Sequence, residues 1–107
     1  IILLNPIDYL EILSINFSAQ VVLTDSGGLQ EECCITGTPC LTLRENTERP
    51  ITLVENGGVS VLVGNDVKTI GKEFEIAQKR DKRPKRPDFW DGKTAERCLS
   101  EIINFRN

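Results

Sequence analysis

Residues 21–32, with the sequence VVLTDSGGLQEE, constrain the fold more than any other stretch of the chain. They begin with a short apolar, β-branched run, which is typical of a buried strand. Ser26, Gly27 and Gly28 then form a turn, and the residues after the turn favour a helix. A strand that enters a helix through small residues predicts an α/β fold.

The turn in this unit predicts an anion site. The first turn of a helix has unpaired N–H groups, and the helix dipole adds partial positive charge there. Gly27 and Gly28 carry no Cβ, so a phosphate group can approach their backbone closely. The Ser26 hydroxyl either caps the helix or donates to a phosphate oxygen. Glu32, four residues after Gly28 on the same helix face, suits the two hydroxyls of a ribose.

Two interpretations of this stretch follow. In the first, it is a nucleotide or nucleotide-sugar site, with a diphosphate on Ser26, Gly27 and Gly28 and a ribose on Glu32. In the second, Ser26 is only an N-cap and the two glycines form only a tight turn between strand and helix. The chain contains neither G-x-G-x-x-G nor G-x-x-x-x-G-K-[ST], so a dinucleotide fingerprint or a Walker P-loop is not supported.

The remaining pattern is that of one domain, residues 1–107, in which short strands alternate with helices. Such alternation predicts a parallel sheet with right-handed crossovers. Asn5–Pro6 and Asp66 are expected helix starts, and Gly37 is an expected helix end. We expect strands at residues 1–4, 21–23, 40–43 and 59–63, and helices over 5–19, 27–36, 51–55 and 66–77. A last helix is expected from residue 91. It carries an apolar stripe of Ala95, Cys98, Leu99 and Ile102.

Two loops of this sheet are expected to share one crevice. Ligands of parallel sheets bind beyond the carboxyl ends of the strands. Residues 25–28 follow one strand, and the charged residues 44–50 follow another. If the two strands are neighbours, an arginine from the second loop faces a ligand that the first loop holds.

Composition excludes several other functions. The chain has no histidine and no C-x-x-C, so a zinc site with the usual ligand spacing is not expected, and we expect the four cysteines to be reduced thiols in a cytoplasmic protein. The net charge of −3 argues against nucleic-acid binding, although residues 79–91, a Pro-containing connection to the final helix, are locally basic. No apolar run approaches the roughly 20 residues that a membrane span needs.

Two motifs resemble those of one known family and follow each other in the same order along the chain. Residues 25–32, DSGGLQEE, resemble the D-S-G-G-[IL]-Q-E-E signature of the UDP-N-acetylglucosamine 2-epimerases, and residues 47–50 match their T-E-R-P. Gly37-Thr38-Pro39 stands where that family has G-x-P. Weaker matches are residues 8–11, 62–64 and 90–93 with Arg97, so the resemblance covers nearly the whole chain.

The resemblance implies a Rossmann-like, three-layer parallel sheet that forms part of the carboxyl-terminal half of a glycosyltransferase-B-type fold. The family's enzymes interconvert UDP-GlcNAc and UDP-ManNAc by eliminating UDP and adding it back, without NAD or a metal cofactor. By resemblance, Ser26, Gly27 and Gly28 hold the diphosphate, Glu32 the ribose, and Arg49 lies beside the nucleotide.

The family's acid/base carboxylates and its active-site histidine precede the region that corresponds to this chain. We therefore expect no catalytic residue here and no turnover by the chain alone, with the missing amino-terminal half of the enzyme as a partner. Exposed apolar edges of a partial Rossmann half invite self-association, so we also expect a homodimer. Ile12 replaces an aromatic residue that relatives often carry against the base. Two alternatives stay open: a glycosyltransferase-type nucleotide-sugar domain, and a non-catalytic module.

Overall fold

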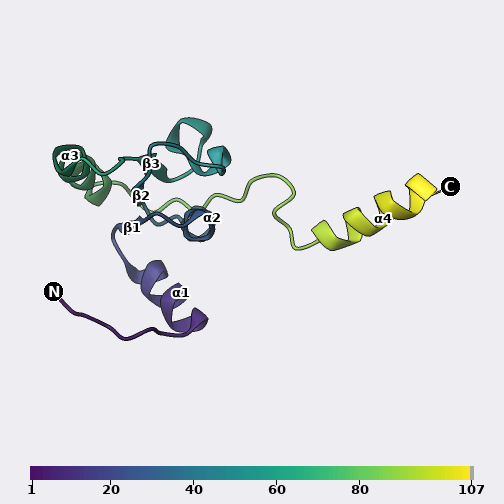
Figure 1. Ribbon diagram of the computed structural model, residues 1–107, viewed down its shortest axis with the longest axis horizontal. Helices are drawn as coiled ribbons and strands as arrows, with labels where there is room; N and C mark the ends of the chain where they lie inside the picture. The colour runs from purple at the N-terminus through teal and green to yellow at the C-terminus, as the bar shows by residue number, and fades with distance from the viewer. Residues whose placement is uncertain (107) are drawn as a thin grey trace.

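A computed structural model describes residues 1–106 and shows a small parallel sheet with helices on both of its faces (Figure 1). Among these residues no helix combines the length and apolar character needed to cross a bilayer. In chain order the elements are α1 (Tyr9–Ser18), β1 (Val22–Thr24), α2 (Gly27–Thr36), β2 (Cys40–Thr42), the 3₁₀ turns η1 (Pro50–Thr52) and η2 (Val54–Asn56), β3 (Ser60–Leu62), α3 (Val67–Gln78) and α4 (Thr94–Arg106).

The sheet has the order β1-β2-β3, and both pairings are parallel. Val22 lies opposite Cys40 and Cys40 opposite Ser60, so the three strands end at the same edge. Every residue of the central strand β2 is buried, as is usual for a parallel strand that is covered on both faces. The expected parallel α/β sheet is therefore confirmed.

Two apolar clusters, one on each face, hold this sheet between its helices. On one face, residues of α2 pack against the strands in a cluster of Val22, Cys33, Cys34, Cys40 and Val59. On the other, α3 packs in a cluster of Leu41, Val63 and Ala77. Cys40 and Leu41 belong to opposite clusters because successive strand residues point to opposite faces. The expected three-layer arrangement follows from this alternation.

The cysteines are free thiols, as expected, and three of them are buried. The hydrogen-bonding contact with Cys40, followed by burial, raises the pKa of the Cys33 thiol. Cys33 therefore stays neutral and serves as a small apolar side chain in the core.

Helix α2 ends where the sequence predicts, at Gly37. This residue is left-handed, with φ of +77°, a conformation that favours glycine. A Cβ at this position would also collide with the backbone of Arg83 and Pro84, so the segment after α3 lies directly on the end of α2. The backbone N–H of Lys85 donates to the carbonyl of Cys34 at 2.8 Å, which fixes the same contact.

Two predictions for the first residues are wrong. Residues 1–4 form no strand and are exposed, because none of the described strands pairs with them. The first helix begins at Tyr9 instead of residue 5, because Asp8 and Glu11 form a capping box: each side chain accepts the other's backbone N–H. Leu10 of this helix is 72% exposed.

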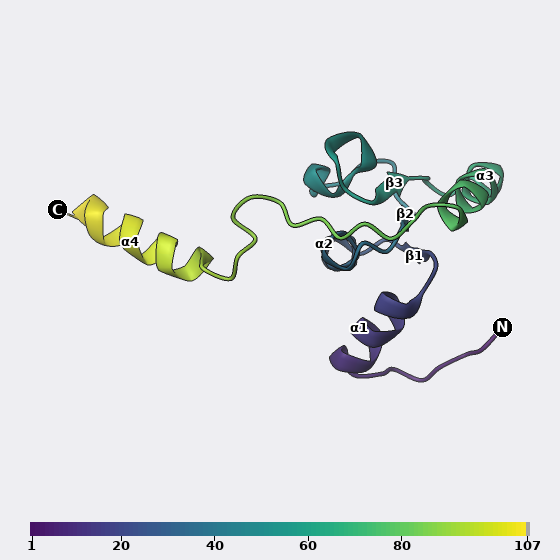
Figure 2. The same cartoon turned by 180° about the vertical axis from the view of Figure 1, so that it is seen from behind.

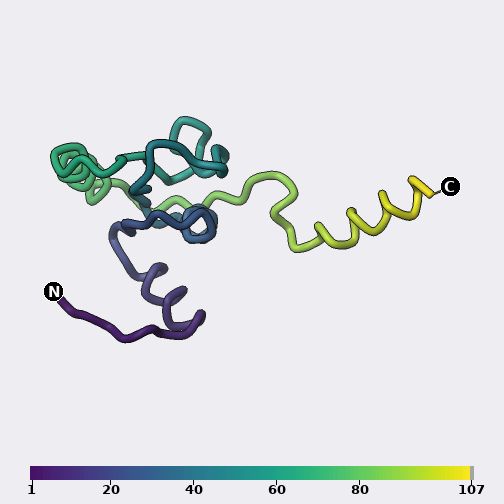
Figure 3. Tube along the Cα trace, viewed as in Figure 1, coloured from purple at the N-terminus to yellow at the C-terminus, as the bar shows by residue number. Residues whose placement is uncertain are grey.

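The last helix lies away from the sheet. Figures 1 and 2 show α4 at the end of an extended connection, on the side of the molecule opposite α3. The Cα trace in Figure 3 follows this connection along α2 before it leaves the sheet. The expected apolar stripe of α4 exists, but its Leu99 and Ile102 are exposed. Arg97 pairs with Asp91 at 2.9 Å and fixes the start of the helix, which lies at Thr94, three residues later than expected.

Candidate functional site

The turn between β1 and α2 forms the capped start of helix α2. Ser26 is the N-cap of α2, and its Oγ accepts the backbone N–H of Leu29 at 3.3 Å. Its own N–H donates to Thr24 Oγ1 at 3.1 Å. Of the two roles considered for Ser26, the structure shows the cap. Because accepting a hydrogen bond uses only a lone pair, the Ser26 O–H can still donate to a ligand.

The two glycines follow as the first residues of the helix. Within residues 1–106, the N–H groups of Gly27 and Gly28 donate no hydrogen bond to the protein. These are the donors that the start of a helix leaves unpaired. With the partial positive charge of the helix end, they provide two aligned donors for an anion.

The second expected loop lies beside this turn. Because β1 and β2 pair in register, their carboxyl ends lie together, and the loop that follows β2 lies over Gly27. A Cβ built on Gly27 would lie 2.6 Å from Glu48 Oε1 and 3.6 Å from Arg49 Cγ. The two loops are therefore adjacent, as expected, and Gly27 is required for their close approach. A crevice between them for a ligand stays a prediction.

Gln30, which the sequence interpretation did not single out, joins α2 to this loop. It is fully buried, and its Oε1 accepts the hydroxyls of Thr47 at 2.9 Å and Thr52 at 3.3 Å. Thr47 Oγ1 in turn accepts the N–H of Arg49 at 3.0 Å. One signal for this role was present in the sequence: Gln30 precedes the buried Cys33 and Cys34 by three and four positions, so it shares their inward face.

Arg49 lies next to the glycine turn, but its charge is partly compensated. Its Nε lies 2.9 Å from Glu31 Oε1, and both side chains are about two-fifths exposed. The geometry of this ion pair does not meet that of a hydrogen bond, and the buried Nε has no other protein partner among residues 1–106. Such an exposed pair contributes little to stability, so Arg49 can exchange Glu31 for an anionic ligand at low cost.

Glu32 is half-buried, and one of its carboxylate oxygens, Oε2, is buried without a hydrogen-bond partner in the described chain. The Nε2 of the neighbouring Gln30 is in the same state. Buried polar atoms normally find partners, so both groups have capacity for a ligand or for ordered water.

Glu48 changes the electrostatics of the turn in a way that was not expected from the sequence. Its pKa is lowered, first by its own backbone N–H and then by Arg44, whose Nη1 lies 2.9 Å from Oε2. A carboxylate therefore lies beside Gly27 at neutral pH, close to where a phosphate would approach. It accepts no hydrogen bond from Gly27, and its side chain is half exposed, so it can rotate into solvent when another anion arrives.

Comparison with known proteins supports a family for the chain. Residues 1–103 match the sequence family described as UDP-N-acetylglucosamine 2-epimerase. A relative of that name from Methanocaldococcus jannaschii is 44% identical over 97 residues, which are 91% of this chain and 26% of the relative. A second, from Yersinia pestis, is 36% identical and is matched over 97% of this chain and 28% of its own length. The chain thus spans about a quarter of the length of these relatives.

Solved structures show the same similarity in the fold. The chain matches the crystal structure of the M. jannaschii enzyme in complex with UDP-GlcNAc and UDP with a TM-score of 0.81, at 44% identity, over 94% of this chain and 27% of that one. It matches the Neisseria meningitidis enzyme bound to UDP-GlcNAc with a TM-score of 0.76, at 27% identity, over 92% of this chain and 28% of that one. The fold is accordingly part of a glycosyltransferase-B-like α/β architecture.

Proposed function

We propose a role in UDP-sugar binding for this chain, which belongs to the UDP-N-acetylglucosamine 2-epimerase family. Ser26, Gly27 and Gly28 bind the diphosphate, and Glu32 binds the ribose. Arg49 adds a positive charge beside the diphosphate. The observation that carries the proposal is the pair of unbonded amides at the start of α2, directly beside Arg49.

In the whole protein, the proposed reaction interconverts UDP-GlcNAc and UDP-ManNAc, which is an isomerisation. A base removes the proton from C2 of the sugar, the bond between C1 and the UDP oxygen breaks, and re-addition of UDP with a proton on the other face of C2 gives the epimer. Charge develops on the leaving diphosphate, where the two amides and Arg49 can stabilise it. The chain has no histidine, and we assign the base to the part of the enzyme that relatives have in addition, so the chain alone is inactive.

The family assignment favours this role over a glycosyltransferase-type domain. A non-catalytic module remains the second candidate, because exposed apolar residues of α1 and α4 can support self-association into a homodimer. That candidate requires no affinity for UDP at the glycine turn.

Titration of the ¹⁵N-labelled chain with UDP, followed by NMR, tests the proposal. We expect the amides of Gly27, Gly28, Glu32 and Arg49 to shift together and to saturate with one dissociation constant. A response confined to the basic segment around Lys82 would show that the nucleotide is held by charge alone and would contradict the proposal.

The ribose role has a separate test. Glu32→Gln removes a charged acceptor, so we expect affinity for UDP to fall by about tenfold and affinity for inorganic phosphate to change little. Glu101→Gln, on the exposed α4, is the matched control and should leave both affinities unchanged. Equal losses for UDP and phosphate in Glu32→Gln would exclude the ribose role.

A further inference from the structure

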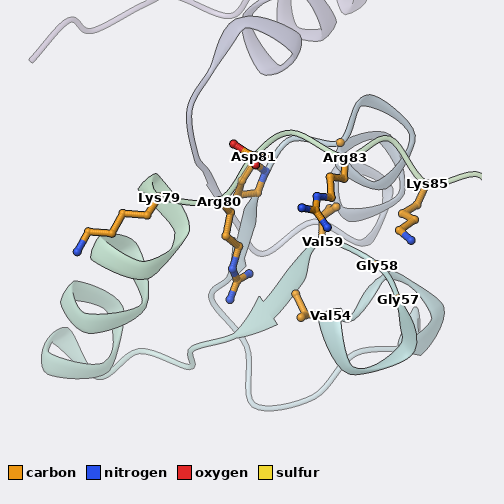
Figure 4. A pocket seen from close by; sticks show the side chains of 11 residues that line it. Val54, Gly57, Gly58, Val59, Lys79, Arg80, Asp81, Arg83 and Lys85 are labelled. Atoms are coloured by element: carbon orange, nitrogen blue, oxygen red, sulfur yellow. The ribbon is translucent and has the colours of Figure 1, made fainter.

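A cavity of about 430 Å³ lies at the edge of the sheet opposite the glycine turn. Its walls include Pro39 and Val59, which precede β2 and β3, whereas the candidate nucleotide site follows β1 and β2. The basic segment after α3 closes one side of this cavity, and η2 with the glycines after it closes another (Figure 4). The volume is in the range of small-molecule sites.

Three cations are directed into this cavity. Figure 4 shows the side chains of Arg80, Arg83 and Lys85 on the same side of the basic segment, extending towards Val54 and residues 57–59. Lys79 extends away along α3, and the Asp81 carboxylate lies on the opposite side of the segment. The side chains that extend into the cavity therefore bring three positive charges and no negative one.

These cations have no carboxylate partner among residues 1–106. The ion pairs of the described chain join Arg44 to Glu48, Arg49 to Glu31 and Arg97 to Asp91. Glu55 and Glu73 line an adjoining hollow with Arg80, but neither forms an ion pair with it. The Nη1 of Arg80 is buried without any hydrogen-bond partner, and a buried guanidinium nitrogen in that state is costly unless an anion meets it.

The negative end of the α2 dipole does not account for these three charges. Helix carbonyls at that end attract cations. At this end of α2, however, backbone N–H groups already bond the nearest carbonyls. The N–H of Arg83 donates to Gly37 O at 3.3 Å, and that of Lys85 donates to Cys34 O at 2.8 Å. Lys82, by contrast, is directed to α1, where its Nζ donates to the carbonyl of Phe17 and lies 5.7 Å from the centre of that ring. The segment thus contacts α2 through its backbone, and the side chains of Arg80, Arg83 and Lys85 are not used in that contact.

We propose that Arg80, Arg83 and Lys85 form a second anion site that takes a small diphosphate-bearing molecule. Two guanidinium groups provide planar donor forks, which match phosphate oxygens, and the lysine adds a point charge. The chain as a whole has a net charge of −3, so this local concentration of positive charge is not a general property of its surface. The site shares no residue with the candidate nucleotide site, so its failure and that of the proposed function are distinguishable.

Titration of the ¹⁵N-labelled chain with inorganic diphosphate tests the proposal. We expect the amides of Gly57, Gly58, Val59, Arg83 and Lys85 to shift together and saturably. Affinity should fall about fivefold in Arg83→Gln and in Lys85→Gln, because each removes one of the three positive charges of the site. Both side chains are on exposed positions, so folding should be unaffected.

Matched variants separate this site from charge alone and from the nucleotide site. Lys72→Gln removes the same charge from an exposed position of α3 outside the cavity and should change affinity less than twofold. Arg49→Gln should leave the shifts at residues 57–59 unchanged. An equal loss in Lys72→Gln, or shifts confined to Gly27 and Gly28, would overturn the proposal. Tighter binding of a poly-glutamate peptide than of diphosphate at this face would also overturn it, in favour of a protein partner.

Discussion

Helices α2 and α4 show how differently two segments of similar length are used in one chain. α2 carries polar residues and cysteines without a clear apolar stripe, yet Gln30, Cys33 and Cys34 are completely buried. α4 has a regular apolar stripe, yet Leu99 and Phe105 are exposed, the latter by 92%. Amphipathicity shows which face of a helix favours burial, but only the neighbouring elements decide whether that face is covered.

The largest difference should appear when one leucine is removed from each region. Leu41 is fully buried in β2, so Leu41→Ala should lower the free energy of unfolding by about 4 kcal/mol. Leu99→Ala on the exposed face of α4 should change it by less than about 0.5 kcal/mol. Urea unfolding followed by circular dichroism measures both. Similar losses would mean that the stripe of α4 is covered in solution, by a second copy of the chain.

Gly37, at the end of α2, and Gly92, before α4, have the same backbone conformation, with φ of +77° in both. Around Gly92 a Cβ would meet open space, so Gly92→Ala should cost only the backbone strain, about 1 kcal/mol. At Gly37 the Cβ would also collide with the backbone of Arg83 and Pro84. We therefore expect Gly37→Ala to lower the free energy of unfolding by about 2–3 kcal/mol, measured by urea unfolding as above. Equal losses would show that the segment after α3 does not lie against α2 in solution.

The cap of α2 should have a smaller effect. Ser26→Ala removes the acceptor for the Leu29 N–H and should lower the free energy of unfolding by about 1 kcal/mol. Ser26→Gly is the control and should cost only a few tenths of a kcal/mol. If Ser26 also binds phosphate, both variants should weaken UDP binding in the NMR titration. Unchanged affinity in both would restrict Ser26 to capping.

The smallest effect should be a pH dependence at the start of α4. Hydrogen bonds from Arg97 lower the pKa of Asp91 from 3.8 to about 2. Because the folded-state pKa lies below the unfolded value, the pair supports the start of the helix above about pH 4 and loses this effect as the pH falls towards 2. NMR titration of the Asp91 carboxyl carbon should give a midpoint near 2. In Arg97→Gln the midpoint should rise towards 3.8, and a midpoint near 4 in the unmodified chain would contradict the ion pair.

Much of the fold was predictable from short stretches of sequence. Val22–Thr24, Ser26 and Gly37 define a strand, a helix start and a helix end through neighbours within a few positions. The strand expected at residues 1–4 could not be assigned correctly in the same way. A strand needs a partner at its edge, and four apolar residues carry no information on whether that partner is present.

The candidate site also has a part that was predictable from the sequence and a part that was not. The expectation that residues 25–28 and 44–50 lie side by side required only that β1 and β2 be neighbours, and they are. The contacts between these two loops were not predictable. The Glu31–Arg49 pair and the Glu48 carboxylate beside Gly27 depend on the path of a loop, and no periodic pattern encodes that path.

The strand–turn–helix unit around Gly27 and Gly28 is specified by its own residues, because the caps, turns and alternation that define it are local interactions. Two other features depend on the packing of the whole chain. Gln30 bonds Thr47 and Thr52, 17 and 22 positions away, and three cations converge on one cavity. Such contacts depend on how the layers pack around the sheet. The free energy of that packing is shared by the whole chain and cannot be assigned to any one stretch of it.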